Sequence, residues 1–597
     1  MPESVGTRLG LAWQDMSVGG GRSVGIYLRT TQRRRKDGSV VRYLQLAHNR
    51  RVGGATRAEV LLNLGREDRL DTDGLRRLAR SITRYTDPGS GDRAPIEGAY
   101  EDEGLEVTGS RPLGGAWVLD CLWRRLGVAQ AIAAALGRRR FATDVERVLF
   151  ALVSNRALAP ASKLAASEWA SRDVHIPGLA EMDEDQAYRA MDLLIDADAE
   201  AKVQEAVFFA CADLLNLEVD LLFFDTTSTY FELEGSEPGE RIDGERAEEG
   251  PPPFRAHGHS KDHRPDLPQV VIGLAVTREG IPVRVWVWPG NTADQSVIEQ
   301  VKDDLRGWRL GRCIWVVDRG FSSEENLRYL TRGGGHWIAG ERMRDGHPDH
   351  EAALARQGRY RTVRDNLQVK EVTVGEGEGA RRFVVCHNPH EAQRDRAKRA
   401  ETIGRLEEEL ARLERQRAKA RSAKATQAHL RGECALREHP SLGRYLRQLK
   451  DGRLRIDRAK LRAEARLDGK FLLSTSDPDL DAEDVALGYK NLLEAERSFR
   501  DLKGALALRP VFHRLEHRIR AHILICWLAL LLIRVAERRS ERTWRTLARE
   551  LQRLHLVTLS GTPGTVAQTT PLTDEQRDIL AALEVEPPPR ITTLDPA

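Results

Sequence analysis

The sequence of 597 residues predicts an α/β protein: a mixed sheet flanked by helices and interrupted by an insertion, after a β-rich module and a helical domain. Three observations predict it. Short β-rich runs begin near residue 25, apolar residues recur at helical spacing from about 113 to 217, and apolar strands alternate with helices from 219 onward. Because so long a chain exceeds one hydrophobic core, we expect several domains.

These patterns divide the chain into six segments. In order, they are a β-rich module with a helix (1–105), a helical domain (106–217), a first part of the core (218–340), an insertion with a β-hairpin and a charged helical hairpin (341–470), a second part of the core (471–539) and a C-terminal tail (540–597).

Composition narrows the class of protein. Hydrophobic residues make up 41% and charged residues 31%, which is typical of a soluble globular chain. The six cysteines form no C-x-x-C pair, so the sequence favours a reducing compartment over a zinc site or a disulfide framework. The N-terminus lacks a signal-peptide pattern. The longest apolar run, Ile523 to Ile533, is shorter than the ~20 residues of a membrane span and predicts a core helix.

Two groups of basic residues have open roles. One is a basic hairpin, Arg33 to Lys36, before a helix expected near residues 73–85; the other is the set Arg124, Arg125 and Arg138 to Arg140 on expected helices. Each is compatible with contact to a nucleic acid backbone or with an ordinary solvated surface.

The order of elements in the core is informative. The strand VDLLFFD ends on Asp225, an acidic loop covers 232–253, and a hairpin turns at Gly280. A helix to about residue 305 and the strand CIWVVD, ending on Asp318, come next, followed by a helix and the strand HWIAG. Strand, strand, strand, helix, strand, helix, strand is the order of RNase H-like folds, in which the first and fourth strands are neighbours. We therefore expect Asp225 and Asp318 to meet.

Paired carboxylates suit metal-dependent phosphoryl transfer. Magnesium takes hard oxygen ligands, and two-metal catalysis holds its ions about 3.5 to 4 Å apart. In one helix expected over 482–502, Tyr489, Glu496 and Lys503 are spaced by seven and form one stripe. Glu496 would complete the metal site, while Tyr489, Lys503 and Arg500 would hold DNA phosphates. The alternatives are turn-forming aspartates and an amphipathic helix with ordinary surface charges.

Two other features favour structural roles. In the insertion, Ile403, Leu406, Leu410 and Leu413 follow three-four-three spacing, which predicts local packing in a helical hairpin rather than a dimerisation device. His257, His259 and His263 have no cysteine partners, so we interpret their segment as a polar loop near the site or the DNA rather than a zinc ligand set.

The segment YKNLLEAERSFRDLK resembles the tyrosine, arginine, glutamate and lysine signature of the insertion-sequence DDE transposases. Four further blocks resemble one branch of that group, in the same order: SKDHRPDLPQVVIGLAV, PGNTADQ, DRGFSSEENL and RPVFHRLEHRIRAHILICWLALLL. The resemblance runs from about Leu113 to Arg538. It departs at Leu492, where the signature has arginine, and Arg500 is the residue that could compensate.

The resemblance implies an RNase H-like catalytic core with Asp225, Asp318 and Glu496 as catalytic and metal-binding residues, and Mg²⁺, replaceable by Mn²⁺, as the ion. It implies cleavage of double-stranded DNA at inverted-repeat ends and strand transfer into target DNA, with 106–217 binding the ends. It further implies a homo-oligomer, a dimer on DNA, in the bacterial cytoplasm and on the nucleoid when bound. Two alternatives remain: an RNase H-like nuclease or resolvase, and a degenerate copy that only binds DNA.

Overall fold

The computed structural model divides into two compact units, Met1–Ala210 with Leu528–Ala597, and Cys211–Trp527. It describes residues 26–34, 40–52, 55–67, 70, 75, 105–137, 144–196, 199–217, 219–232, 253–308, 310, 313–562 and 564–596. The tip of the basic hairpin, most of the helix expected near 73–85, Arg138 to Arg140 and nearly all of the acidic loop at 232–253 lie outside the described residues.

The first unit begins with the predicted β-rich module, an antiparallel sheet in the order β1-β2-β3. The helical domain follows, and its α4 is capped by Asp144, whose side chain accepts a hydrogen bond from the Arg147 backbone N–H. The elements are β1 (Ile26–Arg34), β2 (Val40–Val52), β3 (Ala55–Arg66), α2 (Gly114–Arg125), α3 (Val128–Leu136), α4 (Val145–Leu158), α5 (Lys163–Glu168), a π-helix (Trp169–Asp173), α6 (Glu184–Asp196) and α7 (Ala199–Leu215), which runs into the second unit.

Two of the arginines with open roles have partners inside this unit. Arg124 lies 2.8 Å from Asp120, and Arg125 donates to the Leu583 carbonyl at 3.1 Å and pairs with Glu584 at 3.6 Å. Both guanidinium groups therefore serve intramolecular contacts in this structure.

The C-terminal segment is not a tail, so that prediction was wrong. It forms α17 (Trp544–Leu551), β16 (His555–Gly561), β17 (Gly564–Thr569), α18 (Asp574–Ala582) and β18 (Ile591–Pro596). Its strands join a four-stranded sheet, β18-β17-β16-β4, in which β4 is Glu106–Pro112. The partner strand lies about 450 residues earlier, as in the contact of Thr108 with Thr558, so no local pattern reveals the pairing.

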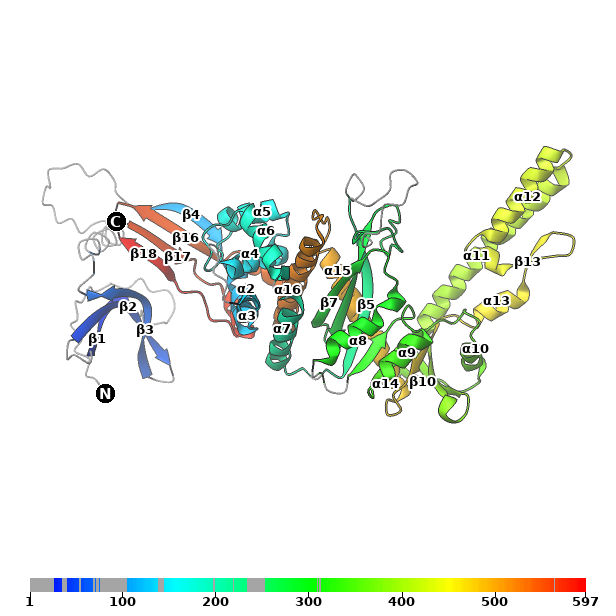
Figure 1. Cartoon of the computed structure of the whole chain (residues 1–597), viewed down its shortest axis with the longest axis horizontal. Coiled ribbons are helices and arrows are strands. Elements are labelled where there is room, and N and C mark those ends of the chain that lie inside the picture. Colours follow the sequence, from blue (N-terminus) through cyan, green and yellow to red (C-terminus); the bar gives the residue numbers. More distant parts are fainter. Residues whose placement is uncertain are drawn as a thin grey trace. The chain divides into compact units, whose positions relative to one another are not determined.

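The second unit contains the predicted strand order. Five strands lie in the order β7-β6-β5-β8-β9. Strand β6 pairs antiparallel with both β5 and β7. Strand β8 pairs parallel with both β5 and β9. This is the RNase H-like topology, with α8 and α9 in front of the sheet in Figure 1. The elements are β5 (Leu221–Tyr230), β6 (Gln269–Thr277), β7 (Pro282–Pro289), a 3-10 turn (Asp294–Ser296), α8 (Ile298–Arg306), β8 (Ile314–Val317), α9 (Glu324–Thr331) and β9 (His336–Glu341).

The first part of the expected insertion extends this sheet. The predicted hairpin LQVKEVTV against RRFVVCH forms β11 and β12, and β12 pairs antiparallel with β15, which pairs with β9. The result is a nine-stranded sheet. The added elements are α10 (Pro348–Ala355), β10 (Arg361–Arg364), β11 (Leu367–Val374), a 3-10 turn (Gly377–Gly379), β12 (Arg381–His387) and β15 (Lys470–Thr475).

The second part of the insertion is a helical arm, in which α11 and α12 lie antiparallel and side by side (Figure 1). Leu406 and Leu413 pack in one cluster with Leu436, Leu442 and Tyr445, so the leucine stripe is local packing as predicted. The elements are α11 (Pro389–Lys419), α12 (Ala423–Glu438), a 3-10 turn (Gly443–Tyr445), β13 (Leu446–Gln448), β14 (Leu454–Ile456) and α13 (Arg458–Ala465).

The helix expected over 482–502 is two helices, α14 (Ala482–Lys490) and α15 (Leu493–Lys503), so the prediction of a continuous stripe was wrong. The Leu492 N–H donates to the Tyr489 carbonyl and the Ala495 N–H to the Leu492 carbonyl, both at 3.0 Å. These bonds span three residues instead of four and tighten the chain at the break.

The apolar run near the C-terminus lies in α16 (Glu516–Ser540). By length and composition alone this helix could cross a membrane, but 94% of its most apolar window is buried inside the structure. Such burial is typical of the core helix of a soluble protein, which agrees with the prediction from the sequence.

Candidate active site

The two predicted aspartates lie side by side. The parallel pairing of β5 and β8 ends with Phe224 opposite Val317, and the next residues are Asp225, within β5, and Asp318, directly after β8. Neighbouring strands run about 4.8 Å apart, so both carboxylates start from adjacent positions on one edge of the pairing. The sequence predicts that the strand ends on Asp225, and this was wrong. Strand β5 continues to Tyr230, because β6 pairs with it as far as that residue.

Burial and neighbouring negative charge make Asp225 a weak acid. The pKa of Asp225 is raised to about 7, chiefly by burial and further by Asp318 and Asp294, while Lys261 and the Thr226 N–H oppose the rise. That N–H donates to Asp225 Oδ1 at 2.7 Å. A carboxylate in such surroundings gains more from a nearby cation than a solvated one does.

Lys261 and Asp294 complete the surroundings of Asp225, and no sequence pattern predicted a role for either. Lys261 Nζ lies 3.0 Å from Asp294 Oδ2 and 4.0 Å from Asp225 Oδ1, and it donates to the Thr226 carbonyl at 2.8 Å. Thr226 Oγ1 in turn donates to Asp294 Oδ1 at 2.6 Å. The signal available was their place in the blocks SKDHRPDLPQ and PGNTADQ, but neither follows an apolar strand as Asp225 and Asp318 do.

The loop with the three histidines packs beside the site, as predicted. The Lys261 backbone N–H donates to Ser228 Oγ at 2.9 Å, and so attaches this loop to β5 three residues beyond Asp225.

Tyr489 contacts Asp318 directly. Its hydroxyl donates to Asp318 Oδ1 at 2.7 Å, and its ring stacks on Phe471 with centroids 6.2 Å apart. Gly340 leaves room for it, since a Cβ there would lie 2.3 Å from Tyr489 Oη. Burial and the charge of Asp318 raise the pKa of Tyr489, so the phenol stays protonated and is a hydrogen-bond donor at neutral pH. In this structure its partner is the carboxylate; its predicted DNA contact stays a prediction.

Lys503 anchors α15 to the same strand. Its Nζ donates to Thr227 Oγ1 at 2.6 Å and to Asp262 Oδ1 at 2.8 Å, and Arg509 lies 3.2 Å from Asp262 Oδ2. Burial lowers the pKa of Lys503, and the bond to Asp262 opposes that fall. Thr227 is two residues from Asp225 and shares its face of the strand.

Glu496 and Arg500 have exposed side chains on α15. Glu496 precedes Lys503 by two helical turns and lies on the same side of the helix. Among the described residues no group of three or more histidine, cysteine, aspartate or glutamate side chains is spaced to hold a metal ion. The structure brings together Asp225, Asp318 and Tyr489, with Lys503 close along β5, while the roles expected for Glu496 and Arg500 stay predictions.

Two family models match parts of this chain. A model described as the transposase DDE domain matches residues 242–532, a range that contains Asp318 and Glu496 and begins after Asp225. The match defines the class, a DDE transposase. A second model, the N-terminal domain of IS1634 family transposases, matches residues 28–93. The chain belongs to the insertion-sequence DDE transposases.

Other comparisons add little. A piggyBac transposase in a synaptic complex with hairpin DNA, solved by cryo-EM, aligns with 74% of this chain and 82% of its own at 10% identity. Its TM-score of 0.36 is too low to establish a shared fold. Curated proteins gave no significant match.

Proposed function

We propose that this transposase cleaves double-stranded DNA at the inverted-repeat ends of its element and transfers the freed strand into target DNA. Asp225, Asp318 and Glu496 are the proposed catalytic residues. The observation that carries the proposal is the strand register that makes Asp225 and Asp318 neighbours. Two carboxylates on adjacent strands suit a metal-dependent reaction at phosphate.

The donor set fits Mg²⁺, or Mn²⁺ in its place. Asp225 and Asp318 offer hard oxygen ligands, and the raised pKa of Asp225 indicates a position where negative charge is poorly compensated. When bound, the ions would activate the attacking oxygen and stabilise the leaving one. Tyr489 holds the Asp318 carboxylate by its hydrogen bond, Lys261 offsets part of the negative charge, and Glu496 on α15 would supply the third carboxylate.

The proposed partners are the ends of the element and the target DNA, in the cytoplasm of a bacterial cell. Strand transfer joins two DNA ends to one target, so we propose a homo-oligomer, a dimer on DNA, as the active form.

The test is Mg²⁺-dependent cleavage and joining by the full chain on duplexes that carry the element's own ends, with a separate target duplex. Asp225→Asn and Asp318→Asn should bind the ends in metal-free buffer yet lose both reactions. Asp303→Asn is the matched control, because Asp303 is a surface acid that accepts a hydrogen bond from Tyr329.

Three outcomes would contradict the proposal in different ways. Cleavage without joining would indicate a nuclease or resolvase, and binding without either reaction would indicate a DNA-binding protein. Full activity of Asp225→Asn would refute the assigned site.

A further inference from the structure

Most of the helical arm has a strong local excess of basic over acidic residues. Residues 411–466 contain 17 of the 93 lysines and arginines but only six of the 90 acidic residues, a net charge of +11 in a chain of net charge +3. All 17 basic side chains are exposed. A surface with so strong a local excess of one sign attracts a polyanion.

The turn between α11 and α12 and its flanking residues contain basic residues without any acidic ones. Residues 415–432 contain six basic residues and no acidic one. Within the described part of the chain, none of the six has a carboxylate oxygen within the 4.0 Å of an ion pair. We name these residues the tip patch: Arg415, Arg417, Lys419, Arg421, Lys424 and Arg431.

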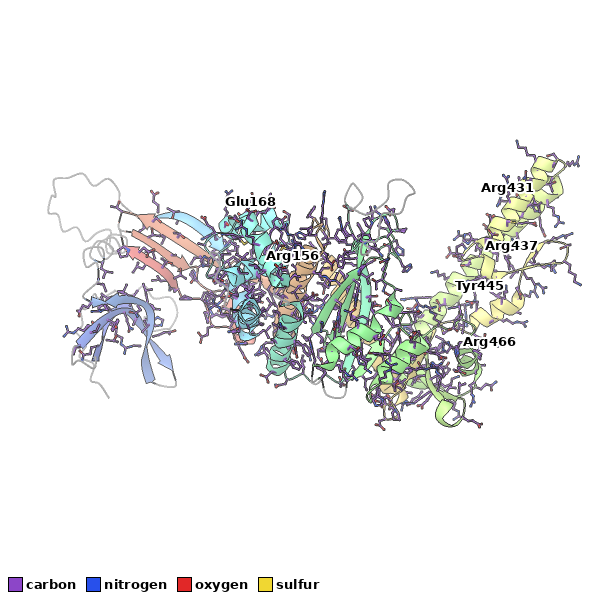
Figure 2. The ribbon with its side chains drawn as sticks, in the orientation of Figure 1. Arg156, Glu168, Arg431, Arg437, Tyr445 and Arg466 are labelled. Atoms are coloured by element: carbon purple, nitrogen blue, oxygen red, sulfur yellow. The ribbon has the colours of Figure 1, made fainter. Side chains whose placement is uncertain are left out.

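Other arginines on the arm do form ion pairs with acidic side chains. Arg394 lies 2.6 Å from Glu391, Arg412 lies 2.7 Å from Glu409 and Arg453 lies 3.0 Å from Asp451. Figure 2 shows Arg431 and Arg437 along α12, and Arg437 too has an acidic neighbour, Glu438 at 3.5 Å. The charge of the tip patch is therefore not neutralised locally, unlike the charge of these residues.

Specific contacts define the turn that carries the patch. Ser422 caps α12 by accepting a hydrogen bond from the Ala425 N–H at 3.2 Å, and the positive end of the α12 dipole adds to the charge of Lys424. Gly432 lets the two helices approach, since a Cβ there would lie 2.9 Å from Leu413. Below the tip, the leucine cluster holds α11 against α12.

The base of the arm is fixed to the sheet. The Asn388 N–H donates to the Gly469 carbonyl at 2.7 Å, and Arg399 pairs with Asp468. Because α11 has 31 residues, it reaches about 46 Å at 1.5 Å per residue. The arm therefore holds the tip patch on packed helices that are attached to the sheet at their base. The patch lies at the end of α11 that is remote from β12.

We propose that the tip patch binds the phosphate backbone of duplex DNA without reading its sequence. Five of the twelve other residues in 415–432 are alanine, and the rest are serine, threonine, glutamine, histidine, leucine and glycine, so few bulky side chains stand between these charges and a phosphate backbone. Lysine and arginine contacts to phosphate set position and affinity but carry no base information. The choice of DNA as the polyanion rests on the proposed function. The target and the DNA that flanks the element offer the same phosphates.

The experiment compares two triple variants of the full chain that lose the same charge from the same arm. Arg417→Gln with Arg421→Gln and Lys424→Gln removes half of the tip patch. Arg394→Gln with Arg412→Gln and Arg453→Gln removes three ion-paired arginines instead. The measurement is the Kd for a duplex of unrelated sequence in metal-free buffer between 50 and 200 mM salt.

The slope of log affinity against log salt should become shallower by about 0.9 for each lost phosphate contact, or about 2.7 for the tip variant. The control variant should change it by less than about 1. Equal slopes for the two variants, or a wild-type slope retained by the tip variant, would overturn the proposal. Circular dichroism checks that both variants keep the arm helical.

Two further experiments on the tip variant, in the presence of Mg²⁺, identify which DNA the tip patch binds. Loss of joining with cleavage retained assigns the patch to target DNA. Weaker binding of ends with long flanks, but not of ends with trimmed flanks, assigns it to flanking DNA. Both results support the tip patch as a DNA contact. A wild-type protein that binds DNA but neither cleaves nor joins would refute the proposed function, while the comparison of salt slopes would still decide the role of the tip patch.

Discussion

The hydroxyl of Tyr489 donates a 2.7 Å hydrogen bond to Oδ1 of Asp318, a residue 171 positions earlier. The bond links α14, which follows the arm, to the end of β8, where the first two acidic residues meet. One oxygen of Asp318 is thereby fixed toward α14, so the orientation of this carboxylate depends on a helix that folds back onto the sheet only after the insertion.

Tyr489→Phe should slow cleavage by about tenfold or more. A hydrogen bond to a charged group contributes about 1.5–3 kcal/mol, and each 1.4 kcal/mol corresponds to a factor of ten. The ring keeps its stacking on Phe471, so the fold should be unchanged. The measurement is the single-turnover cleavage rate as Mg²⁺ is varied. Tyr329→Phe is the control, because Tyr329 also donates a hydrogen bond to an aspartate, Asp303, at 2.8 Å, and this pair is not part of the proposed site. Equal rates for the two variants would mean that the Asp318 contact has no role in the reaction.

Glu496→Gln should lower cleavage by at least about a hundredfold without lowering the melting temperature. The Glu496 side chain is exposed, so its neutral amide costs the fold little, whereas a lost metal ligand removes charge stabilisation from the reaction. Glu494→Gln, two residues earlier on α15 and 3.8 Å from Arg497, should retain activity within about twofold. Similar losses in both variants would indicate a general requirement for negative charge on α15 and would exclude Glu496 as the specific third ligand.

The stability of the metal-free protein should fall as the pH rises from 5 to 8, and Asp225→Asn should remove part of that fall. The pKa of Asp225 is about 7 in the folded protein because of burial and nearby acids, against about 3.9 in an unfolded chain. Between these values the folded state holds a proton that the unfolded state lacks. Its stabilising contribution is complete below pH 4 and is lost as the pH rises through 7.

The measurement for this prediction is the thermal midpoint at pH 5 and pH 8. The wild-type midpoint should drop relative to Asp225→Asn by roughly 5 °C, since each kcal/mol shifts the Tm of a domain this large by about 2–4 °C. Asp303→Asn should follow the wild type. Parallel curves for wild type and Asp225→Asn would show that Asp225 titrates in its ordinary range.

Leu492→Arg should destabilise the protein by about 3 kcal/mol or more and should not raise its affinity for DNA. Leu492 is only 7% exposed at the junction of α14 and α15, so an arginine there must bury a charge or disrupt the junction. Leu493→Arg, at a position 53% exposed, should be nearly neutral. Thermal denaturation and DNA titration of both variants test this. Tighter DNA binding by a stable Leu492→Arg would show that the position reaches phosphate, as the family signature implies.

Local patterns were sufficient for the order of elements from β5 to β9. The apolar runs before Asp225 and Asp318, the hairpin at Gly280 and the leucine stripe of α11 each occupy one short stretch, and periodicity reports directly which side is buried. For the same reason the sequence by itself predicted both aspartates and the RNase H-like order of strands, whereas the transposase family followed from the resemblance of its motifs.

Only the tertiary structure decided which residues meet. The Lys261–Asp294 pair and the bond from Tyr489 to Asp318 join segments that are separated along the chain, and no sequence pattern predicted either contact. The same holds for the pairing of β4 with β16 and of β12 with β15. Hydrogen bonds between strands and between side chains depend on which backbone lies opposite, and that choice is made by packing of the whole unit. It leaves no periodic trace in either segment alone.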